Sequence, residues 1–263
     1  MSNRTSHYLG NYRSMLVTER GDRMIVDTRD QMISPGLLCW GGWEPGTAMA
    51  LDQHLKPGMR WIDIGANIGY FTVLGRKIVG PTGFTLAFEA NPNTYSLLVD
   101  NMNLNWFWDG IKLEQKAVYH TSGMLDFVAP MKYAVNATLA NKAVSSWKSA
   151  QDHVDLFSVE SIRLDDYLSS DEHIDLIKID IEGGELGAIQ GAKRTLERLP
   201  NIKLMIEWSP NQMYEFGFKP LELISEIKSH GFKVSMLEGI NKKISFEDLL
   251  KINQTTMLLL YRD

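Results

Sequence analysis

The chain has 263 residues, of which 44% are hydrophobic and 22% are charged, and its formal net charge is −5. These values are ordinary for a globular protein, and the length suits one α/β domain with elaborations. The net charge and the lack of a basic stripe argue against nucleic acid as the main partner, because phosphate binding rests on clustered Lys and Arg. The sequence contains no apolar run long enough for a membrane span.

Cysteine and histidine content further limits the possible chemistry. Cys39 is the single cysteine, so no intrachain disulfide can form, and we expect a reducing, cytoplasmic compartment. The first twenty residues carry charges and lack an apolar stretch, so we expect no secretory signal. None of the six histidines has metal-ligand spacing. We expect His54 and His230 to have surface roles near helix ends.

The N-terminal part of the sequence predicts a hairpin followed by a covering segment. Residues 14–27 give two β-like runs around a turn, and residues 31–46 are rich in Gly, Pro and Trp, which indicates irregular structure. Residues 47–55 predict a short helix. We therefore divide the chain into an N-terminal hairpin and covering segment (1–46) and a main domain (47–263). The N-terminal segment belongs to the same structural unit as the main domain.

From residue 59 onward, apolar strands alternate with helical patterns. This alternation predicts a Rossmann-like, doubly wound, mostly parallel α/β sheet with helices on both faces. The last two strands are separated by a short segment and predict an antiparallel edge. The predicted strands are 59–64, 84–88, 111–118, 173–181, 202–208, 232–237 and 256–261, with β-like pieces at 124–128 and 158–164. One helix is predicted to begin at Pro92, a second to follow residue 181, and a third to span residues 220–230. A further helical piece is expected at 145–151.

A glycine turn at the end of the first buried strand predicts a cofactor site. The turn is Asp63-Ile64-Gly65-Ala66-Asn67-Ile68-Gly69, and Glu89 ends the next strand. In open α/β sheets, ligands bind at the carboxyl ends of the strands. Glu89 is therefore placed to bind a ribose diol. Nicotinamide dinucleotides and S-adenosylmethionine both contain such a diol.

The turn favours S-adenosylmethionine over a dinucleotide. A dinucleotide site needs G-x-G-x-x-G, but Asn67 and Tyr70 occupy the second and third glycine positions. A carboxylate at Asp63 would also repel a pyrophosphate, whereas it suits the ammonium group of a methionyl tail. A nicotinamide oxidoreductase and a non-catalytic S-adenosylmethionine-binding module are the alternatives, and the intact turn counts against the second.

The sequence resembles the FkbM family of class I S-adenosylmethionine-dependent methyltransferases from Leu55 to Trp208. Residues 47–263 would then be the methyltransferase domain. Ala90 departs from the family pattern, where proline is common, and the loop 105–110 is unusually aromatic. The shared stretches are WIDIGANIGYFTVL, FEANPNTYSLLVDNMNLN, KAV, SIRLDDYL, IDLIKIDIEGGELGAIQGA and LMIEW.

The resemblance implies which residues would bind the cofactor. Glu89 would accept both ribose hydroxyls with Asn91 beside it, and Glu44 of the GGWEPG segment would approach from the covering segment. Lys116 and Ala117 would meet the adenine edge. The residues that would line the methionyl end are Asp63, Gly65, Ala66, Asn67 and Gly69.

Three further acids would lie near the reacting methyl group. Asp180 and Glu182 end the fourth strand and Glu207 ends the fifth. Asp180 is the preferred catalytic base, whereas Glu182 could equally cap the following helix. His153 is an alternative base. Carboxylates could also hold a divalent ion, but we favour a site without a metal.

The resemblance implies O-methyl transfer to a hydroxyl-bearing acceptor, either a glycan or a secondary metabolite. The sequence does not define the acceptor or the oligomeric state. Four tryptophans could form a sugar-stacking surface, although we expect them to pack under the covering segment, with Trp43 as the exception beside Glu44. The four are Trp40, Trp43, Trp106 and Trp108.

Overall fold

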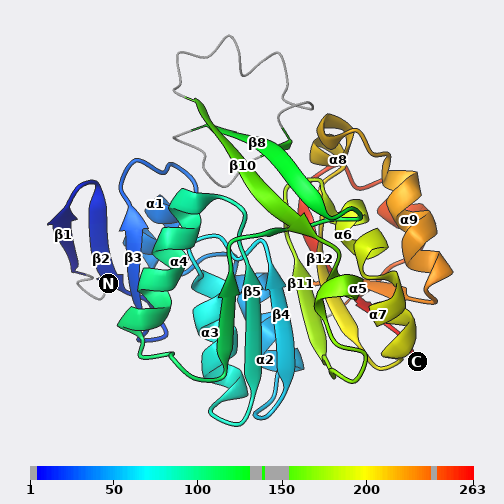
Figure 1. Ribbon diagram of the computed structural model, residues 1–263, viewed down its shortest axis with the longest axis horizontal. Helices are drawn as coiled ribbons and strands as arrows, with labels where there is room; N and C mark the ends of the chain where they lie inside the picture. Colours follow the sequence, from blue (N-terminus) through cyan, green and yellow to red (C-terminus); the bar gives the residue numbers. More distant parts are fainter. Residues whose placement is uncertain (1–4, 131–137, 140–153, 238–241) are drawn as a thin grey trace.

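The apolar runs of the sequence pair into a central eight-stranded sheet in the computed structural model, which describes residues 5–130, 138–139, 154–237 and 242–263 (Figure 1). In sheet order, its strands are β14 (Lys242–Lys243), β13 (Lys233–Met236), β15 (Thr256–Tyr261), β12 (Lys203–Trp208), β11 (Leu176–Ile179), β4 (Arg60–Ile64), β5 (Phe84–Phe88) and β6 (Ile111–Glu114). From β12 to β6 all neighbouring strands are parallel. β15 is antiparallel to both β12 and β13, so the predicted parallel sheet with an antiparallel edge is confirmed.

Helices cover both faces of this sheet and create two cores. One core contains buried residues of α2 (Pro45–His54), α3 (Tyr70–Val79) and α4 (Pro92–Leu104), together with the buried Trp61 of β4. The other involves α6 (Glu185–Gly191), α7 (Lys193–Arg198) and α9 (Pro220–Ser229). Successive strand residues point to opposite faces, so both faces of a buried strand must be apolar. No described helix is both long and apolar enough to cross a bilayer.

The N-terminal residues form a separate antiparallel sheet that packs on α4. It consists of β1 (Ser6–Gly10), β2 (Arg13–Val17) and β3 (Arg23–Asp27), so the predicted hairpin is confirmed and gains a third strand. The backbone N–H of Ile25 donates to Oδ1 of Asn101 at 2.6 Å, which ties this sheet to α4.

The covering segment is not irregular throughout, because it contains the helix α1 (Ile33–Trp40). The Gly and Pro content led to the wrong prediction. Pro35 lies in the first turn, where a backbone N–H has no partner within the helix, so proline costs little there. Gly41 then ends the helix in the left-handed region, with φ 70°.

A third sheet lies across the carboxyl ends of the central strands, where β8 and β10 cross the top of the view in Figure 1. Its strands are β7 (Ala117–Val118), β10 (Val154–Ile162), β8 (Gly123–Pro130) and β9 (Thr138–Leu139). The strand predicted at 111–118 is therefore wrong as one unit. The chain leaves the central sheet after Glu114, and β7 pairs in parallel with β10 instead.

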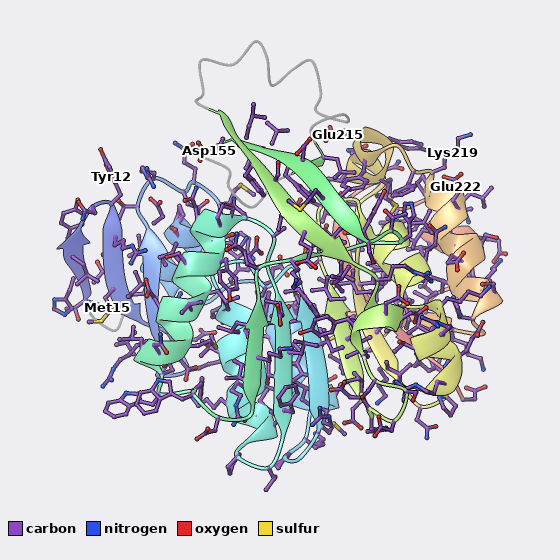
Figure 2. The ribbon with its side chains drawn as sticks, in the orientation of Figure 1. Tyr12, Met15, Asp155, Glu215, Lys219 and Glu222 are labelled. Atoms are coloured by element: carbon purple, nitrogen blue, oxygen red, sulfur yellow. The ribbon has the colours of Figure 1, made fainter. Side chains whose placement is uncertain are left out.

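The remaining helices are short. They are α5 (Leu164–Tyr167), α8 (Pro210–Phe216) and α10 (Phe246–Leu249), and the sequence analysis predicted none of the three. Before α9, the backbone N–H of Lys219 donates to the Glu222 carboxylate at 2.7 Å, and Figure 2 shows both residues at the start of that helix. The helical piece expected at 145–151 lies outside the described residues.

Gly65→Ala tests the close approach of β4 to β11. Gly65 has φ 78°, and a Cβ built there would lie 1.9 Å from the carbonyl oxygen of Asp180. We expect the variant to lose about 3 kcal/mol of unfolding free energy, from backbone strain and the clash together. Chemical denaturation measures this loss. Gly231→Ala is the matched control, because Gly231 has φ 74° and open space around its Cβ position. Equal losses in the two variants would contradict the argument.

Candidate functional site

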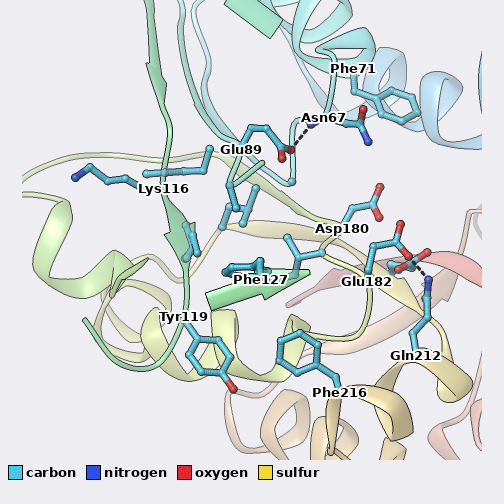
Figure 3. Close-up of a pocket in the computed structure, with 18 of the residues that line it drawn as sticks. Asn67, Phe71, Glu89, Lys116, Tyr119, Phe127, Asp180, Glu182, Gln212 and Phe216 are labelled. Atoms are coloured by element: carbon cyan, nitrogen blue, oxygen red, sulfur yellow. Dashed lines mark hydrogen bonds between the residues drawn. The ribbon is translucent and has the colours of Figure 1, made fainter. Parts of the chain in front are cut away.

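A cavity of about 380 Å³ opens at the carboxyl ends of β4, β5, β11 and β12. Figure 3 shows acids from these strand ends on one side and the aromatic rings of Tyr119, Phe127 and Phe216 on another. The rings come from the β7 end, β8 and α8, so the third sheet and α8 close the cavity over the central sheet. This volume is within the range of small-molecule sites.

The glycine turn shapes the floor of the cavity. The backbone N–H groups of Gly65 and Ala66 both donate to the Phe88 carbonyl at 3.0 Å, which joins the turn to β5. Asn67 has φ 52°, a left-handed conformation that asparagine tolerates better than most residues. Its backbone N–H donates to Oε2 of Glu89 at 2.7 Å (Figure 3). The turn and the acid after β5 are thus held as one unit.

Glu89 is a buried carboxylate fixed by donors from three directions. Besides Asn67, the backbone N–H of Asn91 donates to it at 2.8 Å and the Thr94 hydroxyl donates at 2.9 Å. Burial raises the pKa of Glu89, and these donors oppose the rise. Oε1 already accepts two of these hydrogen bonds and Oε2 accepts one, so the remaining acceptor capacity is on Oε2; since Glu89 lines the cavity, it can accept a hydroxyl group of a ligand.

A buried lysine on β11 joins two carboxylates. Nζ of Lys178 lies 3.0 Å from Oδ2 of Asp180 and 3.4 Å from Oδ1 of Asp63. Asp63 is fully buried, receives a hydrogen bond from the Thr72 hydroxyl at 2.7 Å, and does not line the cavity. Burial by itself lowers the pKa of Lys178, but Asp180 and Asp63 outweigh it, so the pKa of this ammonium is raised.

The strand 173–181 was predicted as fully apolar, which was wrong because Lys178 is part of β11. The pairing of Lys178 with Asp63 was not predicted, although the sequence contains a signal for it. Both residues stand in the middle of apolar strands that pair in parallel, and the register places them directly opposite each other.

Two acids at the mouth of the cavity hold their protons unusually strongly. Burial raises the pKa of both Glu182 and Glu207 well above the ordinary value, and the charge of Asp180 adds to the effect. Glu182 accepts a hydrogen bond from the Gln212 side chain of α8 (Figure 3). Oε2 of Glu207 is buried and has no hydrogen-bond partner among the described residues.

Neither Glu182 nor Glu185 caps the helix after β11, because its N-cap is Gly184 and receives no side-chain hydrogen bond; Glu185 instead binds the loop that precedes the helix. Oε1 of Glu185 accepts the backbone N–H groups of Ile181 at 3.0 Å and Gly183 at 3.2 Å. Burial raises the pKa of Glu185 to about 7, against the effect of these donors. Glu182 has φ 58° and lines the cavity, so the structure places its side chain at the candidate site and not in a helix cap.

The structure brings most of the predicted site residues to one wall. Those that line the cavity are Glu44, Gly65, Asn67, Glu89, Lys116, Ala117, Asp180, Glu182 and Glu207. Those that do not line it are Asp63, Ala66, Gly69 and Asn91. Ala66 and Gly69 form the turn, and Asn91 caps α4 by accepting the Asn93 N–H at 2.9 Å. The sequence missed Gln212 and the three aromatic side chains, because their contribution depends on how β8 and α8 fold over the sheet.

Two other expectations about side chains were wrong. Trp40, Trp106 and Trp108 are exposed and do not pack under the covering segment, whereas Trp43 lines the cavity. The His230 side chain is buried rather than on the surface, and its Nε2 lies 3.2 Å from the Glu226 carboxylate. His153 lies outside the described residues. Within those residues, no group of three or more His, Cys, Asp or Glu side chains could hold a metal ion.

Comparison with known proteins identifies similar chains. The family model described as the methyltransferase FkbM domain matches residues 63–234. Methyltransferase sdnD of Sordaria araneosa is 27% identical over 197 residues, covering 66% of this chain and 73% of that protein. The 2-O-methyltransferase NoeI of Sinorhizobium fredii is 29% identical over 185 residues, covering 65% of this chain and 72% of that protein.

One solved structure supports the fold. The crystal structure of methyltransferase FkbM from Methylobacillus flagellatus matches with a TM-score of 0.50 and 16% identity. The match covers 81% of this chain and 50% of that chain, so this chain corresponds to half the length of the solved protein.

Glu185→Gln tests the burial of the acid that binds the loop after β11, through the pH dependence of stability. The pKa of Glu185 rises from 4.5 to about 7 on folding, so wild-type stability falls as the pH increases between these values. Glutamine can still accept the two N–H groups but cannot ionise. We therefore expect the stability of the variant relative to wild type to increase by on the order of 3 kcal/mol from pH 4.5 to pH 8.

Urea denaturation at several pH values measures this difference. Glu215→Gln on α8 is the control, because Glu215 is exposed and its replacement should leave the pH dependence as in wild type. A Glu185→Gln difference that does not change with pH would show that the carboxyl group is not destabilised by burial.

Proposed function

This chain belongs to the FkbM methyltransferase family, and we propose that it transfers the methyl group of S-adenosylmethionine to a hydroxyl group of a sugar, polysaccharide or natural-product acceptor. The similarity to NoeI, a 2-O-methyltransferase, supports transfer to oxygen. We further propose that the protein works in the cytoplasm, since Cys39 is its single cysteine.

The observation that carries the cofactor proposal is the charge of the cavity wall. Lys116 is the one cationic side chain among the lining residues, whereas the acidic ones are Glu44, Glu89, Asp180, Glu182 and Glu207. A wall of carboxyl groups with one cationic side chain, of which only the ionised groups carry charge, favours a sulfonium and an ammonium group over a pyrophosphate. The same wall therefore counts against the nicotinamide oxidoreductase.

The residues on the wall fit S-adenosylmethionine in distinct roles. Glu89 would accept a ribose hydroxyl, because its internal donors fix its orientation and leave acceptor capacity toward the cavity. Lys116 and Ala117 would meet the adenine. Asp63 would not contact the ammonium group of the cofactor directly, because Asp63 is already paired with Lys178. It would act by positioning Lys178.

Asp180 is the residue we propose as the general base. When bound, the cofactor supplies an activated methyl group. The acceptor hydroxyl must lose its proton as the new C–O bond forms, and a positioned carboxylate can take that proton. Lys178 fixes Asp180 at the cavity wall through a 3.0 Å ion pair. Glu182 and Glu207 hold their protons more strongly, so they are better suited to donate hydrogen bonds to the acceptor.

S-adenosylhomocysteine binding tests the class of cofactor. A ligand that binds only the folded state raises the melting temperature by mass action. We expect a clear increase with S-adenosylhomocysteine and none with NAD at the same concentration, measured by differential scanning fluorimetry. An increase with NAD alone would refute the methyltransferase proposal. Transfer of a labelled methyl group to a panel of sugars, polysaccharides and polyketides then identifies acceptors.

Two substitutions separate binding from catalysis. Glu89→Ala should weaken S-adenosylhomocysteine binding by at least about tenfold in calorimetry, because it removes a charged acceptor. Asp180→Asn should lower kcat by about 100-fold or more and leave that affinity within about threefold. Thr94→Val is the control for Glu89, since it removes one internal donor without changing the cavity wall. Unchanged turnover in Asp180→Asn would place the base elsewhere.

A further inference from the structure

A second cavity, of about 460 Å³, lies between the first turn of α2 and the adjoining ends of β12 and β15. Glu44, Glu207 and Thr255 line both cavities, so these three residues form the boundary between them. A molecule in the second cavity would therefore contact two of the acids that also line the first.

Glu207 gives this boundary an unsatisfied hydrogen-bonding group. The residue is 8% exposed, and its Oε2 is buried without a hydrogen-bond partner among the described residues. A buried polar group without a partner is costly, and buried polar groups in native proteins are almost always hydrogen-bonded. A ligand hydroxyl at the boundary would supply the missing partner.

The rest of the second cavity is mainly apolar. Met49, Leu237 and Met257 contribute their side chains, and the register places Met257 directly opposite Glu207 in the β12–β15 pair. Methionine side chains adapt to ligands of different shape. The titratable residues that line this cavity are the acids Glu44 and Glu207, and no cationic side chain is among its described lining residues to pair with an anionic ligand.

We propose that the second cavity is the acceptor subsite, and that it takes a neutral molecule with an apolar body whose reacting hydroxyl lies at Glu207. Deoxysugars and glycosides with an apolar substituent fit this description, and phosphorylated or carboxylated sugars do not. The assignment of a reacting hydroxyl rests on the proposed function. In the transfer, the hydroxyl oxygen bonds to the methyl carbon, the electron pair of the broken C–S bond returns to sulfur, and the hydroxyl proton passes to a carboxylate on the wall.

Methionine-methyl NMR tests the subsite directly. The chain is labelled with [methyl-¹³C]methionine and titrated with 4-nitrophenyl α-L-fucoside, a neutral deoxysugar with an apolar substituent. We expect the Met49 and Met257 signals to shift and the Met124 signal, from an exposed residue on β8, to stay in place. Glucose 6-phosphate should leave all three signals unchanged. The proposal is overturned if the fucoside leaves the Met49 and Met257 signals unchanged, or if glucose 6-phosphate shifts them equally.

A substitution that fills the cavity provides the second arm. Met49 is 48% exposed, so Met49→Trp should fold and obstruct the subsite. We expect it to weaken fucoside binding by at least about tenfold and to leave S-adenosylhomocysteine affinity within about twofold. Met124→Trp is the matched control and should change neither. If Met49→Trp binds the fucoside as tightly as wild type does, the fucoside does not bind in the second cavity and the proposal is contradicted.

The outcomes also separate this inference from the proposed function. The fucoside titration is made without cofactor, so it tests the second cavity even if S-adenosylhomocysteine does not bind. Failure of S-adenosylhomocysteine binding contradicts the methyltransferase proposal, whereas failure of the fucoside shifts contradicts the subsite alone.

Discussion

The buried ammonium of Lys178 is the interaction on which the candidate site depends. It lies in the middle of the central sheet and pairs with Asp63 below the glycine turn and with Asp180 at the cavity wall. Breaking a buried ion pair leaves an uncompensated charge, at a cost of about 3–5 kcal/mol. The pairing therefore fixes β4 against β11 and also fixes the position of the proposed base. One residue links the stability of the sheet to the chemistry at its edge.

The cavity wall and the loop beside it nevertheless carry more acids than Lys178 can balance. The structure accommodates the excess by raising the pKa of Glu182, Glu185 and Glu207, mainly through burial. Such clustered, perturbed acids are common at functional sites, where unfavourable electrostatics is retained for a ligand. A cationic cofactor would relieve part of this repulsion. The acidity that makes the free protein less stable at higher pH is thus the property that would favour S-adenosylmethionine.

Sequence reasoning succeeded where local residues determine the structure and failed where distant packing does. The buried strands and the turn at Gly65 follow from apolar runs and short-range geometry. The helix at Ile33–Trp40 was missed because Pro35 and Gly36 indicated irregularity, although proline is tolerated in a first turn. The roles of Lys178 and Gln212 required the strand register and the position of α8, which no local pattern contains. The candidate acids were found because strand ends converge at one edge of a parallel sheet.

A crystal structure of the complex with S-adenosylhomocysteine tests the central claim most directly. The account predicts that a ribose hydroxyl lies within hydrogen-bonding distance of Glu89 and that the sulfur faces Asp180 and Glu207 across the first cavity. Adenosine bound outside this cavity, or a ribose with no contact to Glu89, would contradict it.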